Sequence, residues 1–208
     1  MLLVALIFGC RPAHIDKITD SDVSVPADTA TDTATDTGLA TSTDDTGAET
    51  GSSGDTALPS GTFDLVTPEA WAILEASVDP FADHRPADPY CDPSALNVDL
   101  ELFEVDTTLC DYLSAGQGAQ VALRAGETVS VLMYHGSLTW WEEASAHAAV
   151  AVGGEVIWEE TIAIPAASEV YIADVVVPSD VAVGAPVVFH LHNHGSNTWN
   201  LGYLRVTR

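Results

Sequence analysis

Three of the chain's seven histidines lie close together near the C-terminus, at His190, His192 and His194. If this stretch is a β-strand, His190 and His192 point to the same side, with Cα atoms about 7 Å apart. That spacing lets two imidazoles reach one metal ion, and nitrogen ligands favour zinc over calcium. His194 is about 13 Å from His190 on an ideal strand and joins the pair only if the chain turns after residue 193. The pattern predicts a site for zinc or another divalent metal.

The third ligand of such a site stays open. His135 is the first choice, because it ends a predicted strand of matching length and an opposed residue has its Cβ about 5 Å away. His147, near the start of the next strand, is a second choice, and Glu142 or Glu143 would supply an oxygen instead. Without a metal, the same histidines form a polar, hydrogen-bonded outer face.

A second candidate site is the run Trp140-Trp141-Glu142-Glu143. Adjacent side chains of an extended chain point to opposite sides, so at least one indole is expected near the surface. There an aromatic face can stack on a sugar while a carboxylate accepts hydroxyl protons, which makes Trp140, Trp141 and Glu142 candidate ligand-binding residues. The alternative is a loop that folds back and buries both rings.

No catalytic motif accompanies these residues. Neighbouring carboxylates point apart on a strand, so Glu142 and Glu143 do not imply a facing glycosidase pair. Ser130 and Ser137 lie in no nucleophile elbow, and the chain has no glycine-rich phosphate loop. The residues by themselves therefore name no catalytic site.

The elements that hold these residues are predicted to be short strands. In 186–193, Val187, Phe189 and Leu191 alternate with the histidines and are expected to face the core. Glycine- and proline-containing turns separate the strands. Such even spacing, without helical periods between strands, predicts an all-β fold: an antiparallel β-sandwich, jelly-roll-like, of about eight strands. The predicted strands are 97–105, 119–124, 128–135, 146–152, 155–163, 169–177, 186–193 and 198–206.

The segment before these strands is less regular. Thr67-Pro68-Glu69 is typical of a helix start, with Trp71, Ile73 and Leu74 then facing the core; a short strand is the alternative. Residues 79–94 carry four prolines and predict an irregular loop.

The net charge of the chain limits the kinds of molecule that it can bind. The 208 residues carry 31 Asp and Glu against 6 Lys and Arg, a formal net charge of -25. Such a surface repels nucleic acid and anionic lipid, so no nucleic-acid partner is expected.

The N-terminus has two segments of different character. Residues 1–9 are apolar and too short to span a bilayer, as in a signal peptide. Residues 11–60 repeat Asp-Thr among Ala, Gly and Ser without aromatics, which predicts a disordered acidic linker. The expected domains are a signal peptide with Cys10 over 1–10, this linker, and a β-sandwich over 61–208.

Ile7-Phe8-Gly9-Cys10 resembles the lipobox of bacterial lipoproteins. The resemblance implies that Cys10 becomes an acylated N-terminus and that the protein is exported to the outer membrane or cell surface of a Gram-negative bacterium, attached to the membrane by its lipid. An ordinary secretory signal and a chance apolar N-terminus are the alternatives. The layout of residues 97–208, including the last strand from Trp199 to Val206, is similar to jelly-roll carbohydrate-binding modules.

Cys91 and Cys110 are 19 residues apart. With Cys10 used for lipid, the remaining count is even, and an oxidising compartment favours a Cys91–Cys110 disulfide. Two buried free thiols are the alternative.

Three functions remain open at this level. The first is a lipid-anchored binding module for a carbohydrate or a protein. The second is a small, cupin-like, metal-dependent enzyme with His190 and His192 as ligands. The third is a structural envelope or adhesion domain.

Overall fold

The computed structural model describes residues 58–208, which fold into two antiparallel β-sheets. Cys10, the expected lipidation residue, and the expected signal peptide and linker as far as residue 57 lie outside the described residues. Within the described part, no helix has the length and apolar content that a membrane span requires. The all-β antiparallel sandwich with jelly-roll layout is confirmed.

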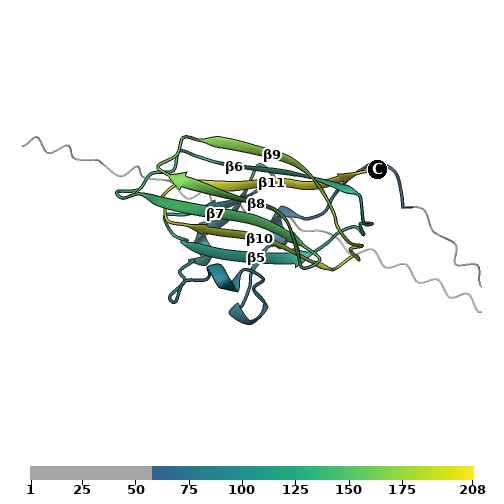
Figure 1. The fold of residues 1–208 in the computed structure, drawn as a ribbon, viewed down its shortest axis with the longest axis horizontal. Coiled ribbons are helices and arrows are strands. Elements are labelled where there is room, and N and C mark those ends of the chain that lie inside the picture. The colour runs from purple at the N-terminus through teal and green to yellow at the C-terminus, as the bar shows by residue number, and fades with distance from the viewer. Residues whose placement is uncertain (1–57) are drawn as a thin grey trace, which may run out of the picture. The chain divides into compact units, whose positions relative to one another are not determined.

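The first sheet has six strands in the order β3-β4-β11-β6-β9, with β1 paired to β11. Their bounds are Thr62–Asp64 (β1), Leu96–Asp99 (β3), Leu102–Asp106 (β4), Thr128–His135 (β6), Glu169–Val176 (β9) and Thr198–Thr207 (β11). The second sheet has five strands in the order β2-β5-β10-β7-β8. Their bounds are Ala72–Ile73 (β2), Tyr112–Gly118 (β5), Ala144–Val152 (β7), Glu155–Ile164 (β8) and Pro186–Asn193 (β10). Figure 1 shows β5, β10 and β7 side by side.

The main core lies between the two sheets. On β10, Val187, Phe189 and Leu191 belong to this core and are at most 1% exposed, as the period-two pattern predicts. They meet residues of the opposite sheet such as Trp199 and Met133, both fully buried. Because the inward face of β10 is apolar, its histidines are left on the outer face of the five-stranded sheet.

That outer face is partly covered by residues 74–91, which we call the covering loop. It contains two 3-10 helices, η2 (Ala76–Val78) and η3 (Ala82–His84). Figure 1 shows it beside β5. Phe81 packs with Ala149, Ala151 and Val188 into a second, smaller apolar cluster on this face. Burial on both faces explains why β10 is almost wholly inaccessible.

Covalent and hydrogen bonds attach the covering loop to β5. The predicted Cys91–Cys110 disulfide is confirmed. Beside it, the Tyr90 N–H donates to Asp111 Oδ1 over 2.7 Å, and the Asp111 N–H donates to the Tyr90 carbonyl over 2.9 Å. At the other end, the Leu74 N–H donates to the Ser114 carbonyl over 2.8 Å. The loop is thus held at both ends against one strand.

Several predicted elements differ in detail. The helix expected after Thr67 is one 3-10 turn, η1 (Pro68–Ala70), followed by the two-residue β2. A further 3-10 turn, η4 (Pro93–Ala95), precedes β3. The predicted strand 97–105 is split by a turn at Leu100 and Glu101, which both have positive φ. Residues 119–124 form one isolated bridge, at Leu123, and the strand lies earlier, at β5.

Candidate functional site

The β10 histidines are positioned by its two neighbouring strands. His190 lies opposite Ser114 of β5 and Ala149 of β7, and His192 lies opposite Tyr112 and His147. Register partners share a face of the sheet, so His147 points to the same side as His190 and His192. His190 is 0% exposed and His192 is partly buried.

A histidine from the covering loop completes the group. His84 ends η3 and its ring lies parallel to that of His147, with 4.2 Å between ring centroids and 10° between planes. The centroid of the His190 ring is 5.3 Å from that of His147 and 5.6 Å from that of His84. One nitrogen from each of these three residues lies within 4.8 Å of the other two. We call His84, His147 and His190 the histidine cluster.

Hydrogen bonds occupy one nitrogen on each of the two strand histidines. His190 Nδ1 is 3.1 Å from the Ser114 hydroxyl, and His147 Nε2 is 3.3 Å from a carboxylate oxygen of Glu159 on β8. The other nitrogens, Nε2 of His190 and Nδ1 of His147, are buried and have no hydrogen-bond partner among the described residues. The same holds for Nε2 of His192. Burying such atoms without a partner costs about 1–3 kcal/mol each.

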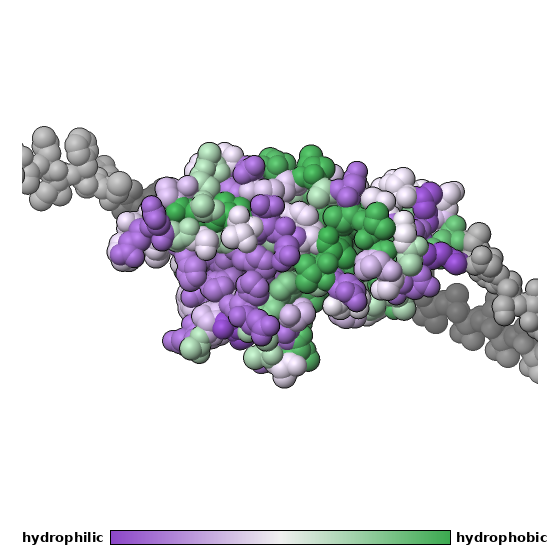
Figure 2. All heavy atoms as spheres, in the orientation of Figure 1, coloured by the Kyte–Doolittle hydropathy of each residue, from purple (hydrophilic) through white to green (hydrophobic). Residues whose placement is uncertain are grey.

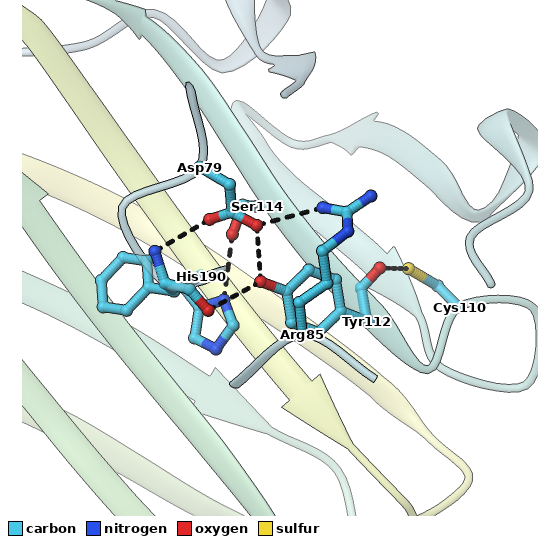
Figure 3. A network of polar contacts seen from close by, with 7 residues as sticks. Asp79, Arg85, Cys110, Tyr112, Ser114 and His190 are labelled. Atoms are coloured by element: carbon cyan, nitrogen blue, oxygen red, sulfur yellow. Dashed lines mark hydrogen bonds and ion pairs between the residues drawn. The ribbon is translucent and has the colours of Figure 1, made fainter. Parts of the chain in front are cut away.

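A buried carboxylate, Asp79, lies near His190 in a network of polar contacts (Figure 3). Asp79 accepts hydrogen bonds from the Tyr112 hydroxyl at 2.5 Å, the Phe81 N–H at 2.9 Å and the Arg85 guanidinium at 3.1 Å. Burial tends to raise the pKa of Asp79, but these donors outweigh burial and lower that pKa. Asp79 is therefore an anion at neutral pH and links the covering loop to β5.

His190, His192 and Tyr112 are uncharged at neutral pH. Burial lowers the pKa of His190 to about 3, with the nearby His147 and His84 lowering it further. Burial and His194 lower the pKa of His192. Burial and the hydrogen bond to Asp79 raise the pKa of Tyr112 to about 12. His190 is thus an uncharged imidazole at any physiological pH, the form in which histidine binds metals.

The structure brings together only part of the predicted ligand set. His190 and His147 meet, and His192 lies directly beside His147. The expected place of His135 is wrong: it lies on β6 in the other sheet, between Trp199 and Glu169, where its ring packs 4.7 Å from that of Trp199. Matching strand length placed it beside β10, but the two strands belong to different sheets. His194 is exposed, and its ring centroid lies 4.6 Å from that of His192.

His84 was not singled out from the sequence. It lies in the proline-rich segment, where no periodicity indicates which way a side chain faces. One signal pointed to the segment: Cys91 ties it to the strand region. That bond places the loop near β5 but does not determine which residue crosses to β7.

Both tryptophans of the second predicted site are exposed. Trp140 is 44% and Trp141 is 76% accessible, and their ring centroids lie 6.3 Å apart. Trp140 lines a shallow hollow of about 470 Å³ together with Glu142, Glu143, Ala144, Ser145 and His194. The alternative of a loop that buries both rings does not hold.

A deeper pocket of about 420 Å³ lies elsewhere, next to β1 and β11. Trp71, Tyr203 and Arg205 are among its lining residues. The Arg205 guanidinium covers the Tyr203 ring at 4.5 Å and pairs with Asp64, while Trp71 stacks on Phe103. The aromatic faces of this pocket are therefore already partly occupied by the protein itself.

Hydrophilic residues gather on the face shown in Figure 2, over the part of the second sheet where β7 and β10 run, and an apolar stripe lies next to them. The histidine cluster and its carboxylates belong to this sheet and to the loop that covers it. The outer side of the five-stranded sheet thus carries both the histidine cluster and the hydrophilic residues seen in Figure 2.

No protein-family model and no curated protein matches the chain. Similar solved structures include a CBM4 carbohydrate-binding module, with a TM-score of 0.39 and 12% identity over 68% of this chain and 89% of that one. For the apo module BiXyn10A CBM1 the TM-score is 0.33 and the identity is 11%, over 72% of this chain and 97% of that one. For the arabinose-bound α-L-arabinofuranosidase MgGH51 the TM-score is 0.33 and the identity is 8%. The match covers 69% of this chain and only 26% of that enzyme. These TM-scores lie below 0.5, so the similarities carry no conclusion about function.

Proposed function

We propose that this protein is a carbohydrate-binding module that holds its ligand against the Trp140–Trp141 pair and is attached to a membrane through Cys10. The observation that carries the proposal is the exposure of two adjacent indoles, 44% and 76%, beside two carboxylates. Large aromatic side chains usually contribute to a core, and exposed ones that gather at one place mark interaction sites.

The chemistry of this surface suits a sugar. An indole offers a flat apolar face that can cover the C–H side of a pyranose ring, and its N–H remains available as a donor. Glu142 and Glu143 supply acceptors for hydroxyl groups. The two rings are inclined by 43° to each other, so they can contact two faces of a ligand, or two successive units of a chain.

The membrane attachment is a separate part of the proposal. It is supported by the resemblance of residues 7–10 to a lipobox, followed by the acidic, threonine-rich stretch. If the 50 residues 11–60 behave as the random coil that their composition predicts, they would span roughly 40 Å root-mean-square, enough to hold a domain away from a membrane surface.

Glycan-array screening followed by calorimetry with the best oligosaccharide tests the sugar site. We expect Trp141→Ala to weaken binding by about 10- to 100-fold, as removal of a central aromatic contact does, with little effect on the melting temperature. Ile172→Ala is the matched control, because Ile172 is 70% exposed on β9 of the other sheet.

Two outcomes contradict the proposal. One is an array on which no glycan binds above background. The other is binding that Trp141→Ala leaves unchanged while Tyr203→Ala abolishes it, which would assign the ligand to the pocket beside β11.

A further inference from the structure

We propose that His84, His147 and His190 together bind one transition-metal ion of the zinc(II) class. This site is distinct from the Trp140–Trp141 surface and does not depend on it. Three segments distant in sequence contribute the ligands: η3 of the covering loop, β7 and β10. The ligand set also differs from the one that the histidine spacing on β10 suggests.

The hydrogen bonds of His190 and His147 indicate which ring nitrogen of each residue is available to the ion. Nδ1 of His190 is 3.1 Å from the Ser114 hydroxyl, and metal binding through Nε2 uses the tautomer in which Nδ1–H donates to that oxygen. That tautomer leaves Nε2 of His190 with a lone pair. Likewise, Nε2–H of His147 donates to the Glu159 carboxylate and leaves Nδ1 with a lone pair. Both lone pairs belong to the buried atoms without a partner.

These contacts are the ones that metal-binding histidines use. A ligating imidazole commonly donates its other N–H to a carboxylate or another acceptor, which fixes the ring and makes the ligand atom more basic. Glu159 contacts His147 in this way, and the Ser114 hydroxyl lies 3.1 Å from Nδ1 of His190. His147 and His190 each leave one buried nitrogen without a hydrogen-bond partner among the described residues, and ring stacking alone does not explain this.

The distances require a modest adjustment. In a tetrahedral zinc site, ligand nitrogens lie about 3.4 Å apart, because each Zn–N bond is about 2.0–2.1 Å. One ring nitrogen from each of His84, His147 and His190 lies within 4.8 Å of the other two. His147 and His190 are held by sheet ladders, whereas His84 is exposed at the end of a 3-10 turn. A rotation of the His84 side chain can therefore bring its nitrogen closer to those of His147 and His190.

The local charge permits a divalent cation. The Arg85 guanidinium, next to His84 in sequence, is paired with Asp79 at 3.1 Å. Glu159 adds a negative charge beside His147. The donors are imidazole nitrogens, which suit zinc and its neighbours and do not suit calcium or magnesium. Three protein ligands leave a fourth position, which His192 next to His147 or an outside molecule can fill.

Zinc binding by the full chain tests the proposal. The chain carries Cys10→Ser, which removes the third cysteine, lacks a polyhistidine tag and is first stripped with chelator. We expect calorimetry to give one Zn²⁺ per chain, and Co²⁺ to give the visible absorption of a tetrahedral nitrogen site. His84→Ala should weaken zinc binding by at least about tenfold, and Glu159→Gln by about tenfold, because second contacts of that kind contribute 10- to 100-fold.

The variants keep the test independent of folding. His84 and Glu159 are exposed, so the metal-free variants should melt at the parent temperature. Asp83→Asn, on the same 3-10 turn as His84, is the matched control and should bind zinc like the parent. The proposal is overturned if the parent takes up no stoichiometric zinc, or if His84→Ala and Glu159→Gln bind it as tightly as the parent does.

Discussion

Asp79 should hold the covering loop against β5, and the substitution Asp79→Asn tests this. The Asp79 side chain is 0% exposed and its Oδ2 accepts from both the Tyr112 hydroxyl and the Arg85 guanidinium. An asparagine keeps the Oδ1 acceptor for the Phe81 N–H but replaces Oδ2 with a donor that faces two other donors. Tyr112 can adapt, because its hydroxyl also lies 3.0 Å from the Phe81 carbonyl. Arg85 cannot adapt, since a guanidinium has no acceptor.

The expected loss follows from these contacts. A hydrogen bond to a charged group contributes about 1.5–3 kcal/mol, and one or two are lost here. We therefore expect Asp79→Asn to lower the free energy of unfolding by about 3 kcal/mol. For a domain of this size, that corresponds to a fall of about 6–12 °C in melting temperature. Circular dichroism at pH 7 measures it, with Asp83→Asn, an exposed neighbour on η3, as the control.

The pH dependence of stability provides a second test of the Asp79→Asn variant. The folded pKa of Asp79 lies below its ordinary value of 3.8. A depressed carboxyl pKa stabilises the fold above the unfolded value, and that stability is lost as the pH falls through the folded value. The difference in stability between the parent and Asp79→Asn should hold from pH 7 to about pH 5 and shrink below about pH 4. A melting temperature equal to that of the parent at pH 7, or a gap that persists unchanged to pH 2, would refute this reasoning.

Three further outcomes are expected. Reducing the Cys91–Cys110 disulfide opens a loop of 19 residues in sequence separation; the chain-entropy model gives a loss of about 3 kcal/mol, seen as a lower melting temperature, and an unchanged melt would contradict the bridge's role. Phe189→Ala removes a fully buried ring from the main core and should cost about 3–5 kcal/mol in denaturant unfolding, whereas Ile172→Ala, on the exposed face of β9, should change it by less than about 0.5 kcal/mol. Cys10→Ser should move the protein from the membrane to the soluble fraction in cell fractionation; a variant that stays with the membrane would remove the basis for the lipid anchor.

The sequence predicted the orientation of side chains correctly where apolar and polar residues alternate regularly along a strand. On β10, strict alternation separates Phe189 and Leu191 from His190 and His192, and the structure places them on the two sides of the sheet accordingly. The disulfide followed from cysteine count and compartment. Both kinds of inference rest on local patterns or on chain chemistry, which tertiary contacts do not change.

Local propensity misled where small residues form a strand. β5 reads Tyr-Leu-Ser-Ala-Gly-Gln-Gly, with no β-branched residue, and so resembles a loop. It is a strand because β10 and β2 pair with it and the covering loop packs beside it, with Leu74 so close to Gly116 that a Cβ there would lie 2.8 Å from the Leu74 side chain. The packing of Leu74 requires a small residue at Gly116, and strand propensities do not include such tertiary contacts.

The histidine cluster was decided by tertiary structure alone. His147 meets His192 through the register of two strands that are far apart in the chain, and His84 reaches them because the covering loop crosses the sheet. His135 and His190 occupy strands of equal length, yet the sandwich assigns them to different sheets. Sequence spacing determines which side chains share a face of one strand. Which strands become neighbours, and what lies over them, depends on how the whole apolar surface of the domain is buried.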